Sequence, residues 1–252
     1  MKIALISTRS TSGKTVTSLL LGGIWAKISK THVYHMTTGS FDEYFNTAPE
    51  IDLKMKGHTP ELKTSLRAAS IESAESFATS FTNAGNYPIC EFSDPTSPEE
   101  KAEAVKGFST LLTPSSLVLI EISNDADVET NSAVINACDV ALVIARPIAG
   151  EYERVKEILY KYSVVIPHLV LLNGVNNRAI TVKELQVWFP EKFLTLSYNP
   201  TIQKYLNKRK LEGLLDSIVR ADNDTTTLRQ EIHSILSRLY APVKIQEVSR
   251  WA

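Results

Sequence analysis

The chain of 252 residues is long enough for one α/β domain or two small ones, and either arrangement buries a sizeable core. Hydrophobic residues make up 43% of it and charged residues 22%, as in ordinary soluble globular proteins, and no apolar run approaches the ~20 residues that span a bilayer. The net charge of -1 excludes a general attraction to nucleic acid, so any such binding requires a local basic patch.

The N-terminal segment 1–30 predicts a strand, a polar loop and a helix. The apolar run Lys2–Ser7 has the length of one buried strand of a parallel sheet, and 16–28 presents an apolar helical face. Between them lies a loop of small polar residues that ends in Gly13-Lys14-Thr15. This order is that of a phosphate-binding loop, in which backbone N–H groups, the helix dipole and Lys14 attract an anion. The hydroxyl of Thr15 would then bind a Mg²⁺ ion that bridges two phosphates.

The loop departs from the usual phosphate-binding pattern at its first position. Thr8 stands where that pattern has a glycine, six residues before the lysine. A variant pattern, Lys-Gly-Gly-x-Gly-Lys-Thr, fits 9–15 with Arg9 in place of the first lysine and without the paired glycines. An ordinary strand–helix turn is the alternative, and the position directly after an N-terminal strand favours the phosphate site.

Apolar strands alternate with helices along the rest of the chain. Strands are predicted at 31–37, 87–92, 117–121, 139–145, 168–172 and 193–196, and helices at 59–81, 97–112 and 151–162, with a last helix capped by Asp224. This alternation predicts a three-layer α/β/α fold on a mainly parallel sheet of about seven strands. With the phosphate-binding loop after its first strand, such a fold resembles that of P-loop NTPases. We expect one domain over 1–241 and a C-terminal tail over 242–252.

The predicted strand 117–121 ends on the carboxylate of Glu121. Phosphate-loop proteins hold Mg²⁺ with such an acid, opposite the threonine of the loop. The carboxyl edge of a parallel sheet is also where α/β proteins bind ligands. A charge that simply faces water at a strand end is the alternative, and the neighbouring loop favours the metal site.

Four segments each carry a motif of one known family. They are the loop 9–15, the apolar strand with its acid 117–123, the helix end and Asp-led strand 131–147, and the strand 169–173 that ends in Asn173. Together they resemble the ParA/MinD family of deviant Walker-A ATPases, over most of the chain. The resemblance implies ATP and Mg²⁺ as cofactors and a homodimer. It places Asn173 at the base, to which an amide offers a donor and an acceptor, and Pro200 at a second base contact.

The resemblance also assigns the site residues. Those assigned to the nucleotide are Thr11, Ser12, Gly13, Lys14, Thr15, Val16, Asn173 and Pro200, and those assigned to the metal are Thr15 and Glu121.

Three departures from the family indicate that binding survives better than hydrolysis. Arg9 replaces the signature lysine that reaches across the dimer, which keeps the charge but changes the geometry. Thr37 and Thr38 stand where the family has the acids that position the attacking water, and Asp42 is the first acid available. The metal acid is a glutamate, one methylene longer than aspartate. The catalytic candidates are therefore Lys14, Arg9 and Asp42, with slow or absent hydrolysis.

Two segments compete as the surface that holds a partner. The basic cluster comprises Lys204, Lys208, Arg209 and Lys210, and it is either a solvated helix end or a contact to a phosphate backbone. The tail 242–252 resembles the membrane-targeting helix of MinD-like proteins, but it is short, and Glu247 opposes an anionic surface. We therefore expect weak, sequence-independent DNA binding ahead of membrane association.

The function implied by the resemblance is nucleotide-dependent positioning of cellular cargo, with plasmid or chromosome partition first. A localisation scaffold for pili or secretion machinery that does not hydrolyse nucleotide is one alternative, and a membrane-associated MinD-like positioning protein is another. A ligase of the dethiobiotin-synthetase type shares the loop and fold, although the sequence shows no substrate motif for it.

A cytoplasmic location is expected from two features. The two cysteines, Cys90 and Cys138, lie in apolar surroundings and predict buried reduced thiols. Met1 runs directly into the first predicted strand, so we expect no secretory signal.

Overall fold

A computed structural model describes residues 1–10, 12–26, 31–35, 89–91, 117–122, 124, 128–176, 179–208 and 210–249. For 26, 31–35, 89–91, 130, 212 and 241–249 it describes the backbone alone. The predicted helices 59–81 and 97–112 lie outside these ranges.

The described strands form one parallel sheet of seven strands. They are β1 (Lys2–Ser7), β2 (Thr31–His35), β3 (Ile89–Glu91), β4 (Leu117–Glu121), β5 (Val140–Ala145), β6 (His168–Val175) and β7 (Phe193–Ser197), in the order β3-β2-β4-β1-β5-β6-β7. The strands β1, β4 and β5 are buried along their whole length, because helices cover both faces of the sheet. The predicted fold class is confirmed.

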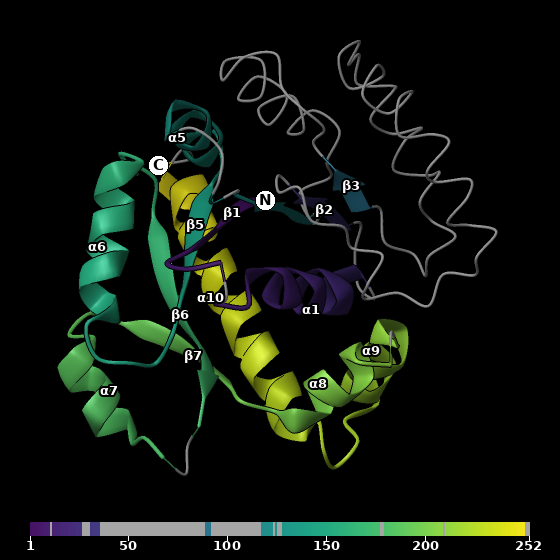
Figure 1. Ribbon diagram of the computed structural model, residues 1–252. Coiled ribbons are helices and arrows are strands. Elements are labelled where there is room, and N and C mark those ends of the chain that lie inside the picture. Colours follow the sequence, from purple (N-terminus) through teal and green to yellow (C-terminus); the bar gives the residue numbers. More distant parts are fainter. Residues whose placement is uncertain are drawn as a thin grey trace, which may run out of the picture.

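Seven described helices cover the two faces (Figure 1). They are α1 (Lys14–Ala26), α5 (Val128–Asn136), α6 (Glu151–Lys161), α7 (Val182–Trp188), α8 (Pro200–Leu206), α9 (Leu211–Arg220) and α10 (Thr226–Ser249). Side chains alternate between the faces along each strand, so Ile3 and Leu5 pack in the core with α1, α9 and α10. Ala4 and Ile6 pack in the opposite core with α5, α6 and α7.

The sequence pattern did not predict α7, α8 and α9, which are short. Two of them carry cap signals that could have been found. A capping box opens α7, where Thr181 accepts from the Glu184 N–H and the Glu184 carboxylate accepts from the Thr181 N–H. Asn199 caps α8, and Pro200 is its first residue.

The last helix, α10, begins later than predicted. The Arg229 N–H donates to the Thr225 carbonyl oxygen at 2.9 Å, so Thr225 occupies the cap position expected for Asp224. The hydroxyl of Thr225 bonds to the carbonyl oxygens of Ser217 and Asp222, which ties this cap to the end of α9. The helix backbone continues to Ser249, into the segment 242–252 predicted as a tail.

The parallel arrangement brings the ends of the central strands to one edge. β1 lies between β4 and β5, with Leu5 beside Glu121 and Ser7 beside Ile144 in the register. The loop that leaves β1 therefore starts next to the carboxylate that ends β4. A ligand at this edge would meet side chains from several strands at once.

Candidate functional site

The loop between β1 and α1 makes a close turn over the carboxyl edge of the sheet. The Thr8 N–H donates to the Ile144 carbonyl oxygen at 3.1 Å, and the Ser12 N–H donates to the Arg9 carbonyl oxygen at 3.1 Å. Gly13 has a φ of +80°, which a side chain rarely adopts, and α1 begins directly after it at Lys14. The N-terminal end of α1, with its partial positive charge, therefore stands at this edge of the sheet.

Three residues predicted to hold phosphate and metal come together at the start of α1. The Lys14 ammonium donates to the carbonyl oxygen of Ile122, just past the end of β4. The Thr15 hydroxyl donates to Glu121 Oε2 at 2.9 Å. The side chain of Lys14 is buried, and Glu121 is 0% exposed. The strand and the loop thus place a cation, a hydroxyl and a carboxylate side by side.

The oxygen atoms of Thr15 and Glu121 fit a Mg²⁺ ion. Magnesium prefers oxygen ligands at about 2.1 Å in an octahedron, so two ligands in adjacent positions lie about 3.0 Å apart. The distance between Thr15 Oγ1 and Glu121 Oε2 is 2.9 Å. No group of three His, Cys, Asp or Glu side chains that could hold a metal occurs among the described residues, so such an ion would need phosphate or water oxygens as further ligands.

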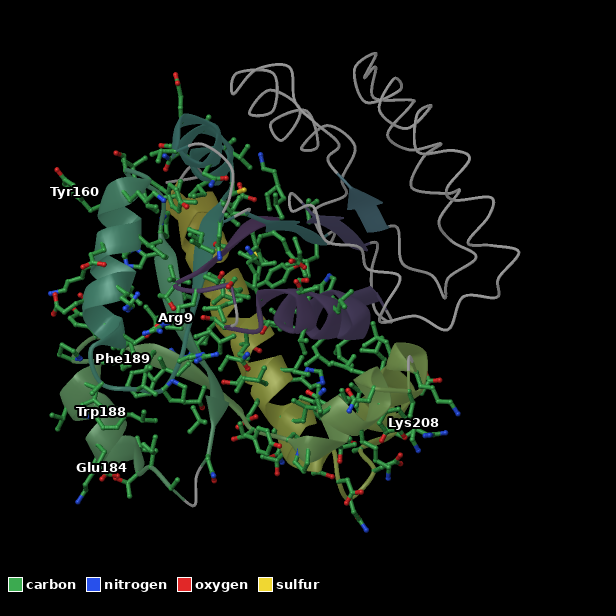
Figure 2. All side chains as sticks on the ribbon, in the orientation of Figure 1. Arg9, Tyr160, Glu184, Trp188, Phe189 and Lys208 are labelled. Atoms are coloured by element: carbon green, nitrogen blue, oxygen red, sulfur yellow. The ribbon has the colours of Figure 1, made fainter. Side chains whose placement is uncertain are left out.

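Arg9 is paired with a buried carboxylate of its own chain. Its guanidinium lies 3.2 Å from Glu151 Oε2, and its Nε donates to the same oxygen at 3.3 Å. Glu151, the first residue of α6, is 0% exposed and also accepts from the Thr8 hydroxyl. Figure 2 shows Arg9 on the α6 side of the loop. Sequence reasoning missed Glu151, because an acid in the first turn of a helix is ordinary.

Asn173 lies directly against the loop. Its Nδ2 donates to the Ser12 carbonyl oxygen at 2.8 Å. A Cβ added to Gly13 would come within 2.2 Å of the same nitrogen. Gly13 is therefore required twice, by its positive φ and by this close approach. The end of β6, where the sequence predicted a contact to a base, is bonded to the loop between β1 and α1.

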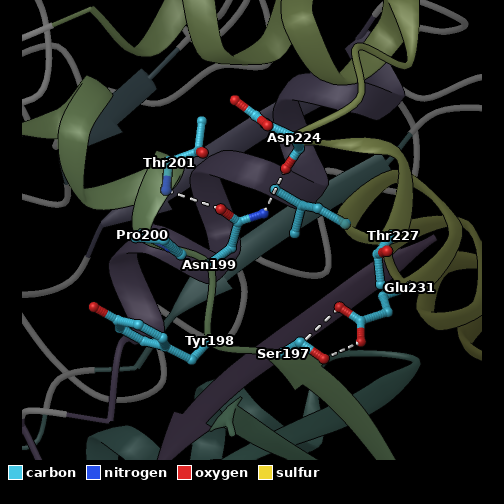
Figure 3. A pocket seen from close by; sticks show the side chains of 9 residues that line it. Ser197, Tyr198, Asn199, Pro200, Thr201, Asp224, Thr227 and Glu231 are labelled. Atoms are coloured by element: carbon cyan, nitrogen blue, oxygen red, sulfur yellow. Dashed lines mark hydrogen bonds between the residues drawn. The ribbon is translucent and has the colours of Figure 1, made fainter. Parts of the chain in front are cut away.

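Pro200 lines a pocket beyond the end of β7 (Figure 3). The pocket has a volume of about 450 Å³ and lies between the start of α8 and the start of α10. Glu231 of α10 accepts from the Ser197 N–H at 2.9 Å and from the Ser197 hydroxyl at 2.5 Å, which holds the strand end on the helix. The Tyr198 side chain is 62% exposed. The Tyr198 N–H donates to the Val175 carbonyl oxygen at 2.8 Å, which joins the edge of the pocket to the end of β6. Asn173 lies on β6, and the pocket follows the neighbouring strand β7.

The other predicted site residues are placed as follows. Ser12 is buried in the loop, and the partly buried Val16 packs against the core of α1, α9 and α10. Thr11 and Asp42 lie outside the described residues, as do Thr37 and Thr38. Sequence reasoning also missed Ser18, which bonds to Glu121 from α1.

None of the described helices combines the length and the apolar character that a membrane-crossing helix needs.

No protein-family model matches the chain, and no curated protein sequence matches it. Solved structures do. The septum site-determining protein MinD of Pyrococcus horikoshii, complexed with Mg-ADP, matches with a TM-score of 0.66 at 13% identity, over 95% of this chain and 97% of that one. A ParA family ATPase from Chlorobium tepidum matches with a TM-score of 0.66 at 10% identity, over 92% and 98%.

A plasmid partition protein from Borrelia burgdorferi matches with a TM-score of 0.56 at 16% identity, over 85% of this chain and 98% of that one. At these identities the likeness concerns the fold. The chain has the fold of MinD and the ParA-family ATPases.

Proposed function

We propose that this chain is a nucleotide-dependent positioning or partition protein that binds ATP and Mg²⁺ at the loop 8–15 and dimerises in that state. The observation that carries the proposal is the convergence of Lys14, Thr15 and Glu121 at the carboxyl edge of a sheet with the MinD/ParA fold. The matching MinD of Pyrococcus horikoshii is complexed with Mg-ADP, which supports a nucleotide at the corresponding loop.

Each residue has a distinct part in the proposed binding. Lys14 supplies a full positive charge to the β- and γ-phosphates, and the N–H groups at the start of α1 supply partial charges. Thr15 and Glu121 hold Mg²⁺, which would neutralise phosphate charge. Asn173 and Pro200 would contact the base, as the resemblance implies. In the bound state the Lys14 ammonium would give up its hydrogen bond to the Ile122 carbonyl oxygen for bonds to phosphate oxygens.

The substitution Lys14→Ala tests the site. It removes the cation nearest the phosphates, and we expect a loss of at least tenfold in ATP affinity, since a charge-assisted hydrogen bond contributes about 1.5–3 kcal/mol. Lys183→Ala, on the exposed surface of α7, is the matched control and should bind ATP as the parent does. Binding is measured by titration calorimetry with Mg²⁺, and dimer formation by light scattering. Equal affinity of Lys14→Ala and parent would show that the site is elsewhere.

Hydrolysis is expected to be slow or absent. The expectation rests on Thr37 and Thr38, which replace the family's acids, so that no side chain is obviously ready to orient water. Phosphate release with purified protein and Mg²⁺ measures it. Rapid turnover abolished by Asp42→Ala would show that Asp42 fills the role of those acids.

The pairing of Arg9 with Glu151 favours a second candidate, a localisation scaffold that does not hydrolyse nucleotide. The Arg9 fork is engaged by Glu151 within the chain, whereas the family's signature lysine reaches a partner's phosphates. A partition protein and a scaffold would differ in their rates of ATP hydrolysis. Nucleoid-stimulated phosphate release supports partition, no release with intact ATP binding supports the scaffold, and metabolite-dependent release would indicate a ligase.

DNA binding is the partner interaction that we propose. Of the basic cluster, Lys204 on α8 and Lys208 and Lys210 after it are exposed, and Lys208 points into solvent (Figure 2). Arg209 lies outside the described residues. Each lysine that neutralises a phosphate steepens the salt dependence of log K by about 0.9, so replacing all three with Gln should reduce the slope by about 2.7. DNA retention is measured across a salt series.

Lys156, Lys161 and Lys183, which are exposed on α6 and α7, provide the matched triple replacement and should leave the salt slope unchanged. Liposome flotation of the parent and of a protein ending at Ala241 tests the membrane alternative. Flotation lost on truncation, without DNA retention at low salt, would reverse the proposal.

A further inference from the structure

Two hydroxyl groups of one helix hold both oxygens of the Glu121 carboxylate. Thr15 donates to Oε2 at 2.9 Å, and Ser18 donates to Oε1. Ser18 is 0% exposed, and its hydroxyl also lies 2.9 Å from the Thr15 carbonyl oxygen. Ser18 follows Thr15 by three residues, so both side chains project from the same face of α1. Both oxygens of the carboxylate therefore bond to the helix that follows the loop.

A glutamate needs such a second contact more than an aspartate does. Its side chain has one more rotatable bond, and holding a long side chain in one conformation costs free energy. A hydrogen bond to only one oxygen does not by itself stop a carboxylate from turning about its last bond. A hydroxyl on the other oxygen stops this rotation and leaves Oε2 facing Thr15, at the separation that fits two ligands of one Mg²⁺ ion.

We propose that Ser18 is a positioning residue for the magnesium site: its hydroxyl holds one oxygen of Glu121 so that the other, with Thr15, faces the ion of a bound nucleotide. The inference rests on the proposed ATP–Mg²⁺ binding. Groups that hydrogen-bond a metal-binding carboxylate tune the affinity for the metal, and their loss typically weakens it by about 10- to 100-fold.

The experiment separates metal positioning from simple burial of a hydroxyl. A fluorescent ATP analogue is titrated into the full chain in EDTA and at a series of Mg²⁺ concentrations. For Ser18→Ala we expect an unchanged affinity for the analogue in EDTA. The Mg²⁺ midpoint, the Mg²⁺ concentration at which half of the Mg²⁺-dependent gain in affinity is reached, should rise about 10- to 100-fold. Ser18→Thr keeps the hydroxyl and should restore the midpoint. Ser217→Ala, which removes another buried serine hydroxyl on α9, is the matched control and should leave it unchanged.

A second arm tests whether Ser18 acts through Glu121. Glu121→Asp shortens the side chain by about 1.5 Å, which takes the carboxylate out of reach of Ser18. In that background Ser18→Ala should cause no further change in the Mg²⁺ midpoint. An equal effect of Ser18→Ala in both backgrounds, or none in the parent, overturns the inference and leaves nucleotide binding intact.

Folding and function are checked separately. Thermal unfolding without ligand is measured for every variant, and Ser18→Cys, a near-isosteric but weak donor, replaces Ser18→Ala if the latter does not fold. The same rise in the Mg²⁺ midpoint is then expected for Ser18→Cys, and an unchanged midpoint contradicts the inference. A parent chain that binds no nucleotide at any Mg²⁺ concentration overturns the proposed function itself.

Discussion

The contact between Gly13 and Asn173 yields a prediction whose size follows from the geometry. Gly13 has a φ of +80°, and an added Cβ would lie 2.2 Å from Asn173 Nδ2. The same nitrogen donates to the Ser12 carbonyl oxygen at 2.8 Å. Gly13→Ala therefore strains the backbone and also displaces the amide that joins β6 to the loop.

The two effects can be added. An alanine in the left-handed region costs about 1–2 kcal/mol. The Asn173 side chain can swing away from the new methyl group, and it then loses its hydrogen bond, which contributes about 1 kcal/mol. Gly13→Ala should thus lower the free energy of unfolding by about 2–3 kcal/mol, and Asn173→Ala alone by about 1 kcal/mol.

The double variant distinguishes this account from backbone strain alone. With Asn173→Ala in place the hydrogen bond is already gone, so the double variant should lose about 2–3 kcal/mol, and the coupling energy is about 1 kcal/mol. Gly150→Ala is the matched control, since Gly150 has a φ of +79° and nothing within 4 Å of an added Cβ. We expect the losses of stability caused by Gly150→Ala and Asn173→Ala to add.

The assay is urea unfolding followed by far-UV circular dichroism, with linear extrapolation to water. A loss of stability in Gly13→Ala no larger than in Gly150→Ala would contradict this prediction, and so would additive effects of Gly13→Ala and Asn173→Ala. Either result would mean that Asn173 does not lie on the loop in solution.

Three further predictions concern stability. Glu151→Gln removes the charge that pairs with Arg9 and should lower the free energy of unfolding by about 1.5–3 kcal/mol, measured in urea. Hydrogen bonds from Thr181 lower the pKa of Glu184. The contribution of the ionised Glu184 to the stability of the fold is therefore complete above the ordinary carboxyl pKa and disappears as the pH falls through the lowered value. The difference in melting temperature between parent and Glu184→Gln should accordingly vanish in acid. Burial raises the pKa of Tyr240 to about 12, and its hydroxyl has no hydrogen-bond partner among the described residues, so Tyr240→Phe should leave the melting temperature unchanged or raised.

The strands and their order along the chain could be predicted from the sequence because the signals of buried strands are local. The run at 117–121 is apolar without alternation, and the structure places β4 at Leu117–Glu121. Short helices escaped the same reasoning, since α7 and α8 are too short to show a clear period. Asp224 was expected to cap α10, but Thr225 has this position because its hydroxyl also closes the end of α9.

Two features of the site were predictable from the sequence: a strand, a loop ending in Gly13-Lys14-Thr15 and a helix follow one another, and Glu121 ends an apolar strand. These features depend on neighbouring residues, so composition and spacing suffice to predict them. The partners of these side chains, in contrast, became visible only in the folded chain.

Arg9 pairs with a residue 142 positions away, Ser18 with one 103 positions away, and Asn173 with a loop atom 161 positions away. Such contacts depend on the strand order that sets β1 between β4 and β5, with β6 next to β5, and on side-chain packing at the carboxyl edge. No local pattern encodes that order, because every apolar strand of a buried parallel sheet satisfies the same hydrophobic requirement.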